Sequence, residues 1–173
     1  MNGCKSLTVD RRKPRLTRKV LVGIATILLA AGAQAAGICT VSITGPAFGV
    51  YNPLNPAATT ANGSVTATCT WTSGGSSNFT LASSYAAGNS GNLVTRYMLS
   101  GANRLDYNLY YDAGFTRIRG DGTGGSQTDT ATLRVSRGQP TATSTSTIYG
   151  RIPPGQSAGP GSYSDTIIVT INY

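Results

Sequence analysis

The side chains that could carry out acid–base chemistry are few in this sequence. Beyond residue 36 there is no histidine, lysine or glutamate, so the general acids and bases reduce to five aspartates and nine tyrosines. Serine is abundant, but no residue type is present that serves as its base in the usual triad. Hydrolysis by paired carboxylates needs two acids across a cleft, and the candidates Asp112 and Asp121 both lie beside glycines that indicate turns. We therefore expect a protein that is not an enzyme.

A glycine-rich stretch, residues 120–125 (GDGTGG), has the composition of a phosphate-binding loop. It lacks the lysine and the following helix that such loops use, and a loose hairpin is the better interpretation. Asp121 within it could contact calcium, but a single carboxylate is weak support for a calcium site. We expect no metal and no cofactor.

Cysteine usage indicates an oxidising compartment. Cys39 and Cys69 form an even pair beyond residue 36, and each lies on the apolar side of an alternating stretch, which is the register that a disulfide between strands needs. A metal site or a reactive thiol are the alternatives, although a metal site would lack further histidine or cysteine ligands. A bridge between them would stabilise the fold by about 3–4 kcal/mol in the chain-entropy model.

The N-terminal region has the three parts of a secretory signal. Seven basic residues precede an apolar run of 12 residues (20–31), and Ala33-Gln34-Ala35 supplies the small-x-small pattern for cleavage. A membrane anchor is the alternative, but the run is shorter than the about 20 residues that span a bilayer. Residues 1–36, with Cys4, are therefore predicted to be removed, and Lys13-Pro14 after Arg11-Arg12 favours the general secretory route over twin-arginine export.

Removal of this segment changes the charge of the protein. The whole chain carries a formal charge of +8, and half of its 14 basic residues lie in the predicted signal. The remaining seven arginines and five aspartates give +2, so we expect no nucleic-acid partner. We also expect no integral membrane segment after cleavage.

Residues 37–173 show the alternation of strands and the turn clusters of an all-β domain, with no sustained helical periodicity. In residues 64–72, for example, Val65, Cys69 and Trp71 share one side and threonines the other, which predicts that Trp71 packs near the cysteines. About seven short strands at this spacing favour a β-sandwich. The strand signals fall at residues 39–43, 64–72, 78–81, 105–111, 133–135, 148–152 and 163–173.

The closing stretch, residues 163–173, is predicted to be the longest strand and the most apolar. A sandwich needs its edge strands to be short, charged or covered, and no later residue is available to cover this one. Either an earlier strand lies on each side of it, or another chain does.

Several motifs in order resemble the spore coat protein U domain family, across essentially all of residues 37–173. Each motif is weak alone, but the ordered set is specific. The motifs are Cys39-Thr40-Val41, FGVYNP (residues 48–53), VTATC (65–69), LDYNLY (105–110), GDG (120–122), YGRIP (149–153) and GSYSD (161–165).

The resemblance implies an incomplete immunoglobulin-like β-sandwich that lacks its final strand, similar to the pilins of archaic chaperone–usher pili. In such proteins a periplasmic chaperone, and then a strand from a neighbouring subunit delivered at an outer-membrane usher, fills a hydrophobic groove by strand addition. Cys39 and Cys69 match the family's disulfide. The groove wall on this sequence would be Ile167, Val169, Ile171 and Tyr173, with the terminal carboxylate as a chaperone contact.

These features together predict an exported structural subunit of a surface pilus or coat, located in the periplasm and then at the cell surface. Cleavage after Ala35 or Ala36 would leave three or fewer residues before Cys39, too few to reach a neighbour. The subunit would then accept a strand without donating one, as a tip or acceptor-only subunit. The alternative function is a self-sufficient adhesin or glycan-binding module, in which Tyr85, Tyr97, Tyr110 and Tyr111 form an aromatic face.

Overall fold

The computed structural model describes residues 37–173; the predicted signal peptide and Cys4 lie outside the described residues. The described part is all-β, as predicted, with one 3₁₀ turn, η1 (Gly88–Ser90), and no helix that could cross a membrane. Its strands are β1 (Gly37–Thr44), β2 (Thr59–Trp71), β3 (Ser77–Tyr85), β4 (Tyr97–Ser100), β5 (Asn103–Asp106), β6 (Asn108–Tyr110), β7 (Asp129–Val135), β8 (Thr141–Ile152) and β9 (Val169–Asn172).

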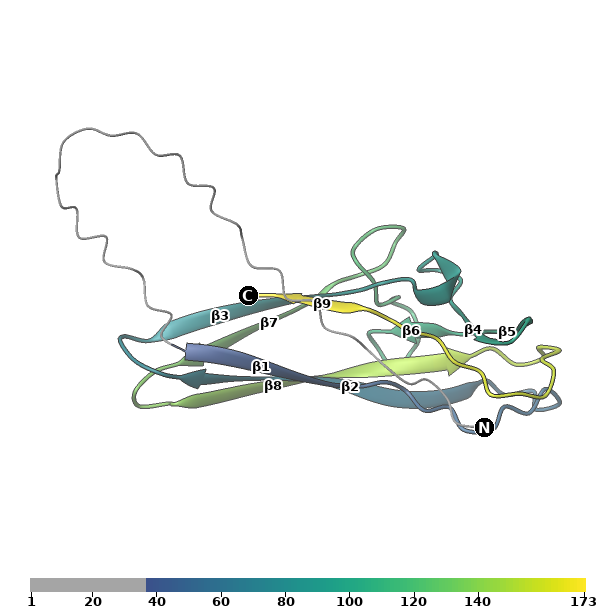
Figure 1. Ribbon diagram of the computed structural model, residues 1–173, viewed down its shortest axis with the longest axis horizontal. Coiled ribbons are helices and arrows are strands. Elements are labelled where there is room, and N and C mark those ends of the chain that lie inside the picture. Colours follow the sequence, from purple (N-terminus) through teal and green to yellow (C-terminus); the bar gives the residue numbers. More distant parts are fainter. Residues whose placement is uncertain (1–36) are drawn as a thin grey trace, which may run out of the picture.

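The strands form two main layers that both run along the long axis of the molecule and lie one above the other in Figure 1. The first is a four-stranded antiparallel sheet with the order β1-β2-β8-β6. The second is a three-stranded antiparallel sheet with the order β7-β3-β9. A small hairpin of β4 and β5 lies at one end of the molecule (Figure 1). This arrangement is a β-sandwich, as the alternation predicted.

Threonine and serine line the outer face of the first sheet. Their hydroxyls pair across strands, at 3.1 Å between the Oγ1 atoms of Thr66 and Thr145 and 3.1 Å between those of Thr68 and Thr143. Such cross-strand pairs stabilise a sheet, and β-branched side chains suit its pleat. The inward residues between them are apolar, so the period of two in the sequence is the period of burial in the structure.

The interior is divided into two neighbouring apolar clusters. One contains the disulfide between Cys39 and Cys69, which joins residues directly opposite each other on β1 and β2. Trp71 packs against this cluster, as the sequence predicted. The larger cluster lies toward the β4–β5 end and is made of residues from all three sheets, including Tyr85, Leu105 and Ile152.

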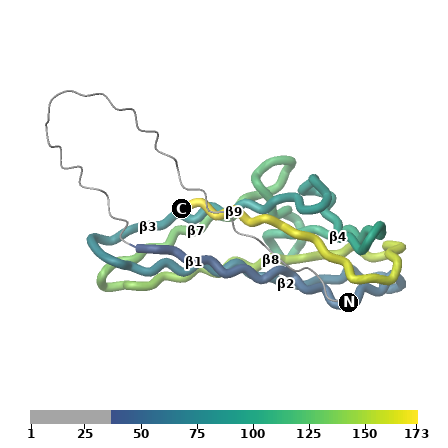
Figure 2. The backbone as a smooth tube through the Cα atoms, viewed as in Figure 1, coloured from purple at the N-terminus to yellow at the C-terminus, as the bar shows by residue number. Residues whose placement is uncertain are grey.

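Two predicted strands differ from the structure. Residues 105–111 are divided between β5, which pairs with β4, and β6, which pairs with β8 in another sheet. The closing strand is also shorter than expected: only β9, four residues long, is regular strand, and the longest strand is β2 with 13 residues. The segment before β9, which Figure 2 shows as a tube running back along the molecule, still alternates between buried and exposed residues.

Candidate partner-strand site

The last strand of the chain has one free edge. β9 pairs only with β3, and β1, at the border of the other sheet, pairs only with β2. Along a strand of an antiparallel ladder, the amide and carbonyl of one residue point toward the partner strand and those of the next residue point away. At the start of this ladder the amide of Ala86 donates to the carbonyl of Ile168, so the backbone of Ile168 points toward β3. The alternation therefore directs the amides of Val169 and Ile171 away from β3, toward the free edge.

The two free edges border the same side of the sandwich. Val41 on β1 and Ile171 on β9 each pack, half-buried, against both apolar clusters. No hydrogen-bonded pairing joins β1 to β9 in the described part of the chain, so this side is not closed by backbone bonds. We refer to it below as the β1–β9 side.

The four predicted wall residues have different environments. Ile167 and Val169 are 1% and 0% exposed, and belong to the larger cluster. Ile171 is half-buried at the border, and Tyr173 is 58% exposed with its ring centroid 6.4 Å from that of Phe79. The inward alternation therefore holds for Ile167, Val169 and Ile171 and not for Tyr173, and only Ile171 and Tyr173 are accessible.

An apolar pocket of about 300 Å³ continues this side toward the β4–β5 end. It is lined by the segment that follows β1 and by the segment that precedes β9, with β4, β5 and the end of β8 beneath them. Gly150 on β8 makes room for Phe48, since a Cβ there would lie 2.7 Å from the Phe48 ring. The lining residues are Phe48, Gly49, Tyr51, Pro53, Met98, Leu105, Ile152, Ala158, Gly159, Pro160 and Tyr163.

The polar groups of the pocket are already engaged. The Tyr51 hydroxyl donates to the carbonyl of Pro153 (3.2 Å) and accepts from the amide of Gln156 (2.8 Å), and the Tyr163 hydroxyl donates to the carbonyl of Gly159 (2.7 Å). A pocket with satisfied polar atoms and apolar walls takes apolar groups.

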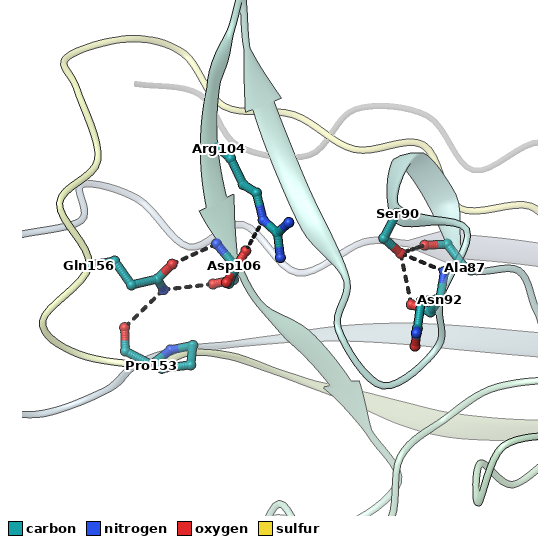
Figure 3. Close-up of polar contacts among 7 residues, drawn as sticks. All are labelled: Ala87, Ser90, Asn92, Arg104, Asp106, Pro153 and Gln156. Carbon is teal, nitrogen blue, oxygen red and sulfur yellow. Dashed lines mark hydrogen bonds and ion pairs between the residues drawn. The ribbon is translucent and has the colours of Figure 1, made fainter.

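Gln156 holds the segment before β9 against the hairpin. Its Oε1 accepts from the amide of Asp106 (2.7 Å), and its Nε2 donates to the carbonyls of Asp106 (2.9 Å) and Pro153 (3.1 Å), as Figure 3 shows. On the far side of the hairpin in the same figure, the Ser90 hydroxyl closes a tight loop between Ala87 and Asn92. The Gln156 side chain thus helps to fix this wall of the pocket.

Asp165 fixes the same segment from inside. This aspartate is almost fully buried and accepts hydrogen bonds from the Tyr107 hydroxyl (2.7 Å) and the amide of Asn89 (2.8 Å). Ser164 beside it exchanges backbone hydrogen bonds with Leu99 on β4 (2.9 and 3.0 Å). The sequence placed Asp165 on the inward side of the closing stretch but gave no sign of its partners.

The predicted aromatic face is not formed. Tyr85 is 0% exposed, and its hydroxyl accepts from Nη1 of Arg119 at 2.9 Å. Tyr97 lies under the Arg104 guanidinium, Tyr110 packs edge-on against Phe115, and Tyr111 lies 4.3 Å from the Arg119 guanidinium carbon. Tyr85 and Tyr111 share Arg119 as a partner, and because Tyr85 is buried the four rings do not form one exposed face.

Arg119 is the centre of a buried polar network between the sheets. Its Nη1 also bonds Asp129 (3.0 Å), and its Nη2 donates to Ser146 (3.0 Å) and to the carbonyl of Thr147 (2.8 Å). Burial raises the pKa of Tyr85, and the Arg119 charge only partly opposes it. Burial, with the hydrogen bond from Tyr111 to Asp129, raises the pKa of Tyr111 to about 12.

Asp112 and Asp121 act in turns, as predicted. Asp112 accepts from the amides of Thr116 and Arg117, and Asp121 accepts from the amide and hydroxyl of Thr123. Among residues 37–173 no group of three or more histidine, cysteine, aspartate or glutamate side chains could hold a metal ion.

The pocket residues were not identified from the sequence as site residues. The motif containing Phe48, Tyr51 and Pro53 was noted only for its resemblance to a family, and Met98 carried no signal. Gly150 was the available clue, because a glycine on the inward side of a strand indicates the close approach of another group.

The described residues thus form a β-sandwich whose last strand, β9, pairs on one side only, with an apolar pocket toward the β4–β5 end. The family model of the Spore Coat Protein U domain matches residues 25–170, and the chain belongs to this family. Membership is consistent with a subunit of an extracellular surface structure. A search of curated proteins found no match.

Proposed function

We propose that this protein is an exported structural subunit of a surface pilus or coat, assembled by donor-strand complementation. The observation that carries the proposal is the free edge of β9, on a side of the sandwich where an apolar pocket lies nearer the β4–β5 end. An added strand would pair its backbone with β9 and place alternate side chains between the sheets. Of the four predicted wall residues, Ile171 and Tyr173 are accessible to such a strand, and Ile167 and Val169 form the buried core behind them.

The proposed partners follow from the same edge. An unpaired strand edge beside apolar surface promotes aggregation, so a periplasmic chaperone would cover it before assembly. An outer-membrane usher and neighbouring pilin-like subunits would then provide the permanent strand. The route is the one predicted for the N-terminal signal: general secretion to the periplasm, and then the cell surface.

The subunit is further proposed to accept a strand without donating one. β1 begins at Gly37 and pairs with β2 over its whole length. A chain cut after Ala36 would therefore have no free segment before β1 to insert into a neighbour. This property fits a subunit at a pilus tip or in a coat.

The adhesin alternative lacks a structural observation in its favour. It required an aromatic face, and Tyr85 is buried while the other three tyrosines have separate partners. The structural-subunit proposal is therefore preferred.

The test is to purify the exported protein from the periplasm and to sequence its N-terminus. We expect co-purification with a chaperone, and aggregation when the chaperone is removed. Hydrogen exchange should be fast at the amides of Val169 and Ile171 in the free chain and slow in the complex, with β2 amides as the internal control. A monomeric, cooperative and high-melting free chain would refute the proposal.

A further inference from the structure

We infer that a cleft between two surface loops binds one ring of a neutral sugar. The cleft, called the loop cleft below, has a volume of about 280 Å³ and lies between the loop that contains η1 and the glycine-rich loop of residues 120–125. The inference goes beyond the proposed function: it adds a weak sugar site to a structural subunit, and none of the four tyrosines of the adhesin alternative lines the cleft. The lining residues are Ala87, Gly91, Asn92, Leu93, Val94, Asp121, Thr123 and Gly124.

One wall of the loop cleft provides a fixed hydrogen-bond donor. The Ser90 hydroxyl donates to the carbonyl of Ala87 (2.8 Å) and accepts from the amide of Asn92 (3.0 Å), as Figure 3 shows. The Oδ1 atom of Asn92 accepts from the amide of Val94 (2.8 Å), which sets the orientation of the side-chain amide. Because Nδ2 of Asn92 has no acceptor among residues 37–173, it is the group left to donate to a ligand.

The opposite wall provides a fixed acceptor. Oδ1 of Asp121 accepts from the amide (2.9 Å) and the hydroxyl (2.7 Å) of Thr123, and no other residue in the described part of the chain bonds to Oδ2. These hydrogen bonds lower the pKa of Asp121, so the exposed carboxylate is charged at neutral pH. The buried Ser126 holds the loop, since its hydroxyl donates to the carbonyl of Thr123 (2.7 Å) and accepts from the amide of Gly122 (3.2 Å).

Apolar side chains and glycine backbone make up the rest of the lining. Leu93 and Val94 are apolar, and Val94 is 49% exposed. Gly91 and Gly124 leave the cleft open, because a Cβ on either would meet no atom within 4 Å. A sugar ring has the same two kinds of surface, with hydroxyls at its rim and C–H groups on its faces. Its hydroxyls would donate to the carboxylate and accept from the amide, while a C–H face packs on the apolar side chains.

The charge and size of the loop cleft disfavour other ligands. No cationic side chain lines it, so a phosphate or a uronic acid would meet the Asp121 charge without a counter-charge. A purely apolar ligand would desolvate the carboxylate without replacing its hydrogen bonds. A metal ion would find a single carboxylate, which is weak support for a calcium site. The volume is at the low end of small-molecule sites and suits one ring.

The experiment is a titration of the isotope-labelled exported chain, together with any chaperone that co-purifies, followed by amide NMR. The probes are the methyl glycosides of glucose, galactose, mannose and N-acetylglucosamine. We expect at least one to bind with a dissociation constant on the order of 1 mM, as for a ligand of about a dozen non-hydrogen atoms. The amides of residues 91–94 and 121–124 should shift and those of β2 should not. The uronic acid of the ring that binds should bind at least about 10-fold more weakly.

Two conservative variants exchange the polar groups and retain the turns. Asp121→Asn keeps the oxygen that accepts from Thr123 and replaces the other oxygen by a donor, and Asn92→Asp keeps the oxygen that accepts from Val94 and removes the donor. Each should weaken glycoside binding at least about 10-fold, with thermal unfolding to check that it folds. Asp112→Asn is the matched control, because Asp112 also accepts from a threonine hydroxyl (2.9 Å) in a turn but does not line the cleft, and it should leave the affinity unchanged.

Three results would overturn the inference. The first is that none of the four glycosides shifts the amides of the two loops, or that the shifts persist in both cleft variants. The second is equal binding of the uronic acid, which would leave the Asp121 charge without a role. The third is tighter binding of calcium chloride or butylammonium chloride than of every glycoside, with the same amides shifted, which would make the cleft a cation site. The proposed function stands in each case, since it depends on β9 and not on these loops.

Discussion

Arg119 shows how a single buried charge can be accommodated between two sheets. The guanidinium is 0% exposed, yet it has a carboxylate, two hydroxyls and a carbonyl within hydrogen-bond distance and the Tyr111 ring against it. Burial works to raise the pKa of Asp129, but hydrogen bonds from Ser146 and Tyr111 and the Arg119 charge outweigh it and hold the pKa below its usual range. The network is therefore charged at neutral pH and joins β7 to β8.

Arg119→Met should destabilise the domain strongly. Removing one partner of a buried ion pair leaves the other charge uncompensated and costs about 3–5 kcal/mol in the free energy of unfolding. Denaturant unfolding of the purified chain measures the change. Arg104→Met is the matched control, because the Arg104–Asp106 pair is half-exposed and its loss should have little effect. Equal effects of the two substitutions would contradict the buried-pair argument.

Tyr111 should make the domain sensitive to alkali. Its folded pKa of about 12 lies above the value of 10 in an unfolded chain, so the protonated hydroxyl favours the folded state. That stabilisation is complete below pH 10 and is lost as the pH rises from 10 to 12. Melting temperatures between pH 9 and pH 12, with absorbance at 295 nm to follow tyrosine ionisation, should show the loss.

Tyr111→Phe tests the assignment. This variant cannot ionise at position 111, so its melting temperature should fall less steeply above pH 10 than that of the unaltered chain. Tyr85, whose pKa is also raised, remains in both proteins and accounts for the residual slope. Identical slopes in the two proteins would exclude Tyr111 as the group responsible.

At the scale of the elements, the disulfide attaches the border strand β1 to the rest of its sheet. It links β1, a border strand with one neighbour, to β2, the strand with the longest pairing in the structure. β1 forms one border of the β1–β9 side, so its attachment affects the proposed partner site as well as stability.

Replacing both Cys39 and Cys69 by alanine should lower the free energy of unfolding by about 3–4 kcal/mol, as expected for the loss of a cross-link across 30 residues. Urea unfolding measures it, and the unaltered chain with dithiothreitol serves as an independent comparison. Hydrogen exchange should increase first in β1, since only its ladder with β2 then holds it. Unchanged exchange in β1 would show that the ladder alone is sufficient.

The sequence predicted the elements better than their connections. Alternation identified the inward set of β2 and of the closing stretch, because burial on one face follows directly from a period of two. It could not show that residues 105–111 divide between two sheets, since Tyr107 continues the same alternation and turns inward to Asp165. The short length of β9 could not be predicted for the same reason. Residues 163–168 alternate between buried and exposed like a strand, but they are not part of a regular hydrogen-bonded ladder.

The candidate site was predictable only in part. Ile167, Val169, Ile171 and Tyr173 were found from their own alternation, whereas the pocket depends on residues far apart in the chain. Phe48, Met98 and Ala158 become neighbours only through the order of the strands. The pattern within one segment does not show which distant residues become neighbours in the fold, so the pocket could be found only from the structure.

On the scale of the whole molecule, the fold is a sandwich in which the last strand, β9, has one edge without a backbone partner. Both sheets are hydrogen-bonded internally and share two apolar clusters, and a disulfide holds one border. The proposed function implies that the part still to be added is a strand beside β9. If that is the defect, a strand supplied by the same chain should repair it without any partner.

A self-complemented variant provides the last prediction. A short turn and a strand of alternating apolar residues, added after Tyr173, would fold back antiparallel to β9 and place its apolar side chains between the sheets. We expect a monomer whose melting temperature is about 10 °C higher than that of the unmodified chain, given the apolar burial and the size of the domain. It should also no longer bind added peptide.

The matched control carries the same added residues with the apolar positions shifted by one, so that they face solvent when the strand pairs with β9. This control should aggregate and show no gain in stability. Size-exclusion chromatography, thermal unfolding and hydrogen exchange at Val169 and Ile171 distinguish the two. If both extensions stabilise equally, the gain would come from added backbone pairing alone, and side chains between the sheets would not be what the free edge lacks.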